Sequence, residues 1–272
     1  LFKDNKMDIE FLGFISDNFI NPKKRIFLGY LLSGFLIAFL WLYFFRKYTL
    51  FNSLKFIFDK KVYFSKSSFV DYSLYVFNSL VMIIFSPILL SQLVIATFIF
   101  EFMYAQNIIE PISINYLNIF LPIAFTVCFF IVDDFSKFFV HMLMHKINFL
   151  WCFHKIHHSA EVLTPMTVFR THPIEGVLFV LRNAISQGAV IGIFFFISSG
   201  ELSLVTVLGA NLFSFIFHLL GSNLRHSHIS ISYGRVVEKF LISPAQHQIH
   251  HSVDKKHHDK NFGVTFAIWD YF

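Results

Sequence analysis

Two copies of the pattern His-x-x-His-His occur in this chain of 272 residues, at 154–158 and at 247–251. With 14 histidines, chance placement gives roughly 0.04 copies of this pattern in the whole chain. On a helix, rings at i, i+3 and i+4 lie close together on one side, and neutral imidazole is a good ligand for iron, zinc, copper and nickel. The doubled pattern therefore predicts metal binding.

A further pair, His141 and His145, has the same one-turn spacing. The three boxes then hold eight histidines, which are His141, His145, His154, His157, His158, His247, His250 and His251. Eight exceeds the four ligands of a tetrahedral zinc site, so the surplus indicates two metal ions. No Glu-x-x-His and no His-Glu-x-x-His occurs, which excludes the carboxylate-bridged di-iron pattern of helical bundles and the zinc protease pattern.

Acidic residues near the boxes suggest hydrogen-bond partners for the ligands. Asp133 and Asp134 could cap a helix, or could accept the free N–H of metal-bound imidazoles, and we favour the second role for at least one of them. Weaker candidates for that role are Glu161, Glu175 and Asp270.

Four other histidines fit less well. His218 lies in an apolar segment, where a hydrogen-bonded core residue and a metal ligand are equally plausible. His172 precedes a proline, which suggests that it supports the metal ligands instead of binding metal itself. His257 and His258 stand in a charged stretch that predicts a solvated loop.

The composition predicts an all-α integral membrane protein. Hydrophobic residues make up 56% of the chain and charged residues only 14%, which is too apolar for a soluble domain. Uncharged runs long enough to span a bilayer cover residues 26–45, 72–100 and 112–132, and a hairpin of two helices is expected at 176–199 and 202–220. We therefore expect about four to five spans, with Pro87 and Pro122 bending or dividing theirs.

The charges of the loops predict the orientation. Residues 46–68 carry six Lys or Arg against one Asp, which places this loop in the cytoplasm, and alternation of the spans then brings 133–175 and 221–272 to the same side. A cytoplasmic helical cap would thus hold all the histidine boxes. Since the basic residues cluster beside spans, orientation explains them better than nucleic-acid binding does. Cys128 and Cys152 are too few for a disulfide scaffold.

Together the boxes and their flanks resemble the fatty acid hydroxylase and sterol desaturase superfamily, whose histidine boxes run HxxxH, HxxHH and HxxHH. The flanks that match are Asp133-Asp134, Leu150-Trp151-Cys152-Phe153, Arg170-Thr171-His172-Pro173, Ser243-Pro244, Asn261-Phe262-Gly263 and Ile268-Trp269-Asp270. One departure is Met142, where the family usually has arginine. The resemblance covers the chain from about residue 111, so we expect an N-terminal membrane-anchoring region at 1–110 and a catalytic domain at 111–272.

The resemblance implies an enzyme with two iron ions that uses O2 to hydroxylate or desaturate a lipid, such as a fatty acyl chain or a sterol. It also implies a further ligand position before the last box, for which His226 and His228 fit best. The chain has no haem-attachment, flavin or ferredoxin motif, so electrons must come from a separate donor of the cytochrome b5 or ferredoxin kind. Leu1 in place of Met is compatible with a fragment of a longer chain.

A histidine-rich membrane metal transporter or metal-binding protein is the alternative. A transporter places ionisable residues along a path near mid-membrane, and the expected spans offer mainly Arg182 and His218. The sequence therefore favours the oxygenase.

Overall fold

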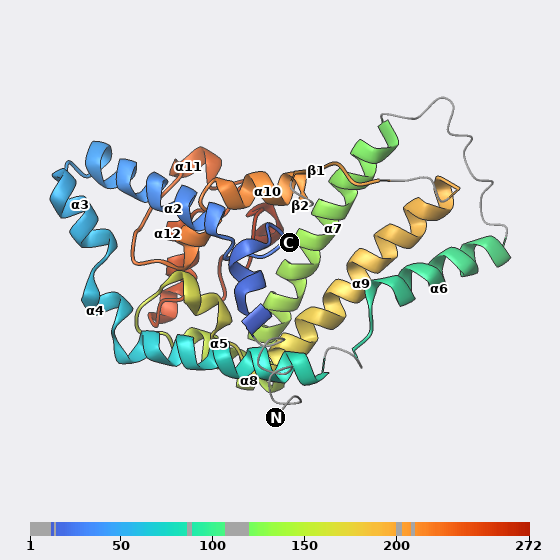
Figure 1. Cartoon of the computed structure of the whole chain (residues 1–272), viewed down its shortest axis with the longest axis horizontal. Helices are drawn as coiled ribbons and strands as arrows, with labels where there is room; N and C mark the ends of the chain where they lie inside the picture. The colour runs from blue at the N-terminus through green and yellow to red at the C-terminus, as the bar shows by residue number, and fades with distance from the viewer. Residues whose placement is uncertain (1–11, 14, 86–88, 107–119, 200–202, 208–209) are drawn as a thin grey trace.

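The computed structural model describes residues 12–13, 15–85, 89–106, 120–199, 203–207 and 210–272, and these fold mostly into helices (Figure 1). In the N-terminal part the elements are α2 (Leu28–Leu40), a π-helical turn η1 (Trp41–Phe45), α3 (Leu50–Ile57), α4 (Lys60–Tyr63), α5 (Lys66–Phe85) and α6 (Gln92–Ala105).

From the middle of the chain onward, longer helices alternate with short 3-10 turns, and one small antiparallel sheet pairs Thr206 with Asn211. The elements are α7 (Phe120–Lys146), α8 (Asn148–His158), η4 (Pro165–Phe169), α9 (Pro173–Ile197), β1 (Thr206–Val207), β2 (Ala210–Asn211), α10 (Leu212–Leu219), η5 (Ser222–His226), α11 (Gly234–Val237), α12 (Pro244–His250), η6 (Lys255–His257) and η7 (Ile268–Tyr271).

Three helices in the described residues are long and apolar enough to cross a membrane: Leu28–Phe45, Lys66–Phe85 and Pro173–Ile197. Most of each apolar window is unburied, and on α2 the side chains of Leu28, Leu32 and Leu36, spaced one turn apart, are more than half exposed. Such a continuous apolar stripe is stable against lipid rather than water. These helices support an integral membrane protein, whereas the total number of spans stays a prediction.

Two expected spans have different bounds in the structure. The uncharged run at 72–100 is divided, because α5 ends at Phe85 and α6 begins at Gln92, while Pro87 lies outside the described residues. The run at 112–132 continues as α7 as far as Lys146, and its first eight residues lie outside the described part. Pro122, which was expected to bend or divide this helix, stands in its first described turn.

The expected hairpin of two long helices is only half correct. α9 forms as predicted, but the apolar stretch after it gives the β1–β2 pair and a helix, α10, of only eight residues. Asn211 sets this late start, since its side chain accepts hydrogen bonds from the backbone N–H groups of Phe213 and Ser214 and so caps α10. Apolar length alone had suggested a membrane helix here.

α9 lies between α6 and α7, in the part of the molecule that extends away from α12 (Figure 1). Two glycines one turn apart allow α6 to approach α9 closely. A Cβ atom on Gly188 would stand 2.7 Å from the backbone oxygen of Gln92, and one on Gly192 would stand 2.6 Å from that of Ala96. Small residues at this spacing are typical of helices that pack together inside membranes.

We expect Gly192→Ala to destabilise the protein by about 1–3 kcal/mol, because the added methyl group overpacks against backbone that has to move. Thermal unfolding of the detergent-purified protein measures this loss. Gly176→Ala, on the same helix, is the matched control: its Cβ would meet only the Met82 sulfur at 3.9 Å, and alanine is the better helix former. Equal effects of the two substitutions would contradict the close approach of α6 and α9.

Candidate metal centre

Local sequence signals place the histidine-bearing helices. α12 begins with a capping box, in which the Ser243 hydroxyl accepts from the Gln246 N–H and the Gln246 side chain accepts from the Ser243 N–H, with Pro244 as first residue. At the start of α9, which also has proline as its first residue, the His172 Nδ1 accepts from the Ile174 N–H. These caps fix the start of each helix and thereby which side chains face the centre of the molecule.

Nine histidines converge on two adjacent points. The first group, called the five-histidine group, consists of His141 and His145 from α7, His154 and His158 from α8, and His250 from α12. The second, called the four-histidine group, consists of His157 from α8, His226 from η5, and His247 and His251 at the end of α12. Within each group the potential ligand nitrogens all lie within 4.8 Å of one another.

Each HxxHH box contributes to both groups, in opposite senses. In α8 the first and last histidines, one turn apart, enter the five-histidine group, and the middle one, His157, enters the other. In α12 the first and last histidines, His247 and His251, enter the four-histidine group, and the middle one, His250, enters the five-histidine group. Neighbouring helical residues point about 100° apart, so one box can serve two metal ions. The stacked rings of His158 and His251, with centroids 4.5 Å apart, join the two groups.

Three of the histidine rings make a hydrogen bond through Nδ1, and these bonds fix which ring nitrogen is free to bind a metal ion. The Nδ1–H of His141 donates to the Phe262 carbonyl at 2.8 Å, that of His250 to the Lys260 carbonyl at 2.8 Å, and that of His154 to Glu175 at 3.0 Å. Because oxygen acceptors hold the proton on Nδ1, each Nε2 keeps its lone pair for a metal ion. His226 differs, since a guanidinium nitrogen of Arg25 lies 2.9 Å from its Nδ1 and can only donate.

The inner nitrogens have the environment that a metal ion requires. Nε2 of His145, of His154 and of His158 is buried without a hydrogen-bond partner in the described structure, and the Nε2 atoms of His141 and His250 approach to 3.1 Å. Buried unpaired polar atoms are costly, so a cluster of them calls for a ligand. The residues present therefore fit two metal ions, one in each group.

Burial also keeps the rings neutral. It lowers the pKa of His141 to about 4 and that of His157 to about 3, and it lowers the pKa of the other seven well below the ordinary value, with neighbouring rings adding to the effect. Metal ions bind imidazole only in its neutral form. At neutral pH the site is thus ready to accept metal without first releasing protons.

Arg170 ties α8 to the N-terminal part of the chain. Its guanidinium donates to the backbone oxygens of Ile156 and Ser159 at the end of α8, and it pairs with the buried Asp71 of α5 at 3.0 Å. The Thr167 hydroxyl of η4 donates to the other oxygen of Asp71. This network holds the turn of α8 that carries His157 and His158.

Arg170→Ala is expected to destabilise the protein by about 3–5 kcal/mol, because it leaves the Asp71 carboxylate buried and unpaired. Thermal unfolding and metal retention of the purified protein test this, and both should fall. Lys256→Ala removes a solvent-exposed pair with Asp254 and should change little. An Arg170 variant as stable as the Lys256 variant would refute the role of this network.

The role favoured for Asp133 and Asp134 was wrong, because neither carboxylate accepts a hydrogen bond from a histidine in the described structure. Asp133 pairs with Lys137 and Arg182, and Asp134 accepts from the backbone of Thr265 and Phe266 and from the indole of Trp269. Asp134 therefore fastens the C-terminal segment to α7. Glu175, ranked lower from the sequence, is the carboxylate that bonds a ligand candidate, while Asp270 accepts from the N–H groups of Phe262 and Gly263.

His228 and His218, two of the candidate ligands, are outside both groups. His228 Nε2 lies 2.8 Å from the Phe56 carbonyl oxygen on the exposed side, because the extended Ser227 turns the side chain after it away from His226. His218 bonds the Ser222 hydroxyl, and its ring lies tilted against that of Tyr30 with the centroids 5.1 Å apart. The other three histidines with weaker predictions also belong to neither group: His172 caps α9, His257 bonds Ser252, and His258 lines a cavity beside the five-histidine group.

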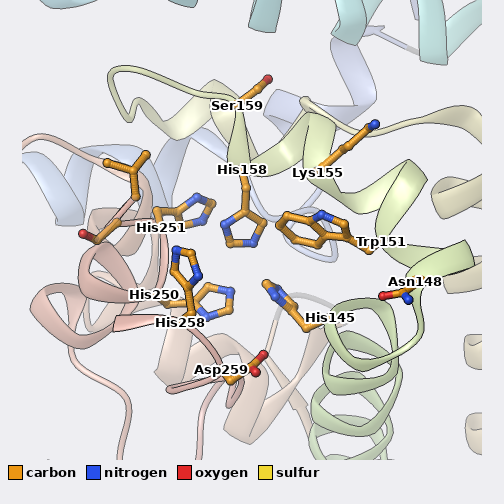
Figure 2. Close-up of a pocket in the computed structure, with 12 residues that line it drawn as sticks. His145, Asn148, Trp151, Lys155, His158, Ser159, His250, His251, His258 and Asp259 are labelled. Atoms are coloured by element: carbon orange, nitrogen blue, oxygen red, sulfur yellow. The ribbon is translucent and has the colours of Figure 1, made fainter. Parts of the chain in front are cut away.

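Cavities reach the histidines from two directions. One, of about 520 Å³, is lined by His145, His158, His250 and His251 together with Trp151, and Figure 2 shows these rings around it. The other, of about 350 Å³ and called the inner cavity, is lined by members of both groups, by Glu175, by apolar side chains such as Phe179, and by Arg25 near the start of α2. Between them the two cavities are lined by all nine histidines of the two groups.

Comparison with known proteins matches the C-terminal half. The fatty acid hydroxylase family model matches residues 126–272. Alkylglycerol monooxygenase of Caenorhabditis elegans is 29% identical over 149 residues, which are 55% of this chain and 26% of that protein. Ornithine lipid hydroxylase OlsE of Rhizobium tropici is 27% identical over 155 residues, 55% of this chain and 41% of that protein.

A third relative, the Delta(7)-sterol 5(6)-desaturase ERG3B of Gibberella zeae, is 25% identical over 126 residues, 46% of this chain and 34% of that protein. The chain thus spans between about a quarter and two fifths of the length of these curated relatives. No solved structure matches the chain. These relatives are oxidoreductases that act on lipids by name, and the matched region holds all three histidine boxes. The resemblance predicted from the boxes is confirmed, and the chain belongs to the fatty acid hydroxylase family.

Proposed function

We propose that this protein is a membrane-bound di-iron oxygenase that hydroxylates or desaturates a lipid with O2 and electrons from a separate donor. The observation that carries the proposal is the convergence of nine histidines, seven of them buried and two half-buried, on two adjacent points within the region that matches lipid-oxidising relatives. Bound iron would supply what side chains lack, the ability to activate O2 toward an unactivated C–H bond.

The chain's own residues position the reaction. The five-histidine and four-histidine groups would each hold one iron ion. The carbonyls of Phe262 and Lys260 and the Glu175 carboxylate would hold three of the rings in the orientation that metal binding needs. Val168, Phe179 and Val264 give the inner cavity an apolar wall for part of a lipid. The three apolar helices would anchor the site beside the bilayer, with the boxes at the cytoplasmic face, so that the lipid enters from the membrane.

The test uses the full chain purified in detergent and loaded with ferrous iron. It receives membrane lipid extract, oxygen-18 gas and either cytochrome b5 or a ferredoxin with the matching reductase, and products are measured by mass spectrometry. We expect O2-dependent lipid products, in which labelled oxygen marks hydroxylation and loss of two hydrogens marks desaturation. Binding of zinc with no lipid oxidation under any donor, together with zinc flux in vesicles, would support the transporter instead and overturn the proposal.

A further inference from the structure

The inner cavity carries an excess of positive charge. Four cationic side chains line it, Lys23, Arg25, Lys137 and Arg225, against one carboxylate, Glu175, which is already bonded to His154. Lys137 is balanced by Asp133, which lies 2.5 Å away. The excess therefore comes from Lys23 and from the two arginines.

Neither Arg25 nor Arg225 has a carboxylate within ion-pair distance among the described residues, although Arg170 and Arg182 both do. Arg225 is 2% exposed and donates to the backbone oxygens of Ser222 and Val264. Arg25 contacts the neutral ring of His226, and its buried Nε has no partner in the described structure. A cation that is screened from water and has no anion beside it is costly, so the described residues leave this cavity suited to an anionic group.

The position of these cations indicates where such an anion comes from. Arg25 stands three residues before Leu28, where a candidate membrane span begins, and Lys23 is exposed beside it. Lysine and arginine at this depth meet the phosphate layer of the bilayer. The same cavity has an apolar wall, and its volume of about 350 Å³ is at the small end for ligand cavities, which suits a head group and the first carbons of a chain.

We infer that the inner cavity binds the anionic head group of a lipid, a phosphate or a carboxylate, through Arg25 and Lys23. Because Arg25 also contacts His226 of the four-histidine group, the C–H bond to be oxidised then lies within a few bonds of that head group. This second statement rests on the proposed oxygenase function, whereas the binding of the anion does not.

The experiment measures equilibrium binding of three radiolabelled lipids with the same acyl chain to the full chain in uncharged detergent: lysophosphatidate, the free fatty acid and the monoacylglycerol. It needs neither O2 nor reductant, so its outcome is independent of catalysis. We expect both anionic lipids to bind about tenfold or more tightly than the neutral one, as for a hydrogen-bonded charge. Equal affinities of all three would overturn the inference, even if the protein oxidises lipids.

Matched variants assign the preference to the cavity. Arg25→Gln should remove most of it and Arg25→Lys should retain much of it, while Lys23→Gln, at an exposed residue that cannot unfold the protein, should reduce it severalfold. Lys24→Gln is the neighbouring control and should bind as the wild type does, since Lys24 is outside the lining and pairs with Asp17. A preference unchanged in both the Arg25→Gln and Lys23→Gln variants would refute the assignment.

A competition with inorganic phosphate separates a lipid head group from a free anion. We expect millimolar phosphate to displace lysophosphatidate only weakly, since it lacks the chain that packs against the apolar wall. Phosphate that binds as tightly as the lipid would assign the cavity to a free anion and overturn the lipid assignment.

Discussion

His157→Ala is expected to abolish lipid oxidation and to reduce bound iron by about one ion per chain. His157 is the single member of its box that enters the four-histidine group, and its Nε2 lies 3.2 Å from that of His226. Losing a ligand should cost more than the about 10–100-fold that loss of an outer hydrogen-bond partner costs. Initial rates of product formation and iron content of the same preparation measure both effects.

His228→Ala is the control for this substitution. The same change of residue type is made close to the site, but His228 points to the Phe56 carbonyl and belongs to neither group. It should retain iron and most of the activity. If His228→Ala loses iron as His157→Ala does, then the side chain of His228 does not point away from the four-histidine group and His228 is a ligand.

Glu175→Leu is expected to lower metal affinity or activity about 10–100-fold, because it removes the acceptor that holds the proton of His154 on Nδ1. Glu175→Gln keeps an oxygen acceptor without the charge, so comparison of the two variants separates the hydrogen bond from the negative charge. A milder effect in the glutamine variant indicates that fixing the tautomer is the main role. The readouts are iron retained during dialysis against a chelator and the rate of lipid oxidation.

Glu161→Gln controls for the loss of an acidic residue near α8. Glu161 was also a candidate partner of the ligands, but in the structure its backbone N–H donates to the Ser67 hydroxyl. We expect iron retention and activity close to those of the wild type. Equal losses in the Glu175 and Glu161 variants would show that general acidity near the site matters, rather than the bond to His154.

The sequence predicted the three boxes and their joint role because helical spacing brings i and i+4 residues together without knowledge of the fold. It could not predict that His157 and His250 exchange between the groups, since this depends on how α8 and α12 face each other. The sequence also could not show that His226, and not His228, enters the four-histidine group, because the extended conformation of Ser227 decides which of the two side chains points inward.

Other differences have similar physical causes. Two of the three groups that accept a hydrogen bond from the histidine Nδ1 atoms are backbone carbonyls, which cannot be recognised from a sequence. The third, Glu175, is 21 positions from its histidine. Asp133 and Asp134 looked like the better partners because they precede the first box, yet both serve to pack neighbouring segments. Apolar length predicted α2 and α9 well, but it failed after α9, where the Asn211 cap limits α10 to eight residues.

The amount of iron bound per chain tests the central claim most directly. Iron should be quantified together with zinc by mass spectrometry of the metals, in wild-type protein and in variants that remove one histidine from each group, His145→Ala and His247→Ala. Two separate groups predict about two irons in the wild type and about one in each variant. One iron or none in the wild type, or an equal content of iron in all three proteins, would contradict the two-metal centre.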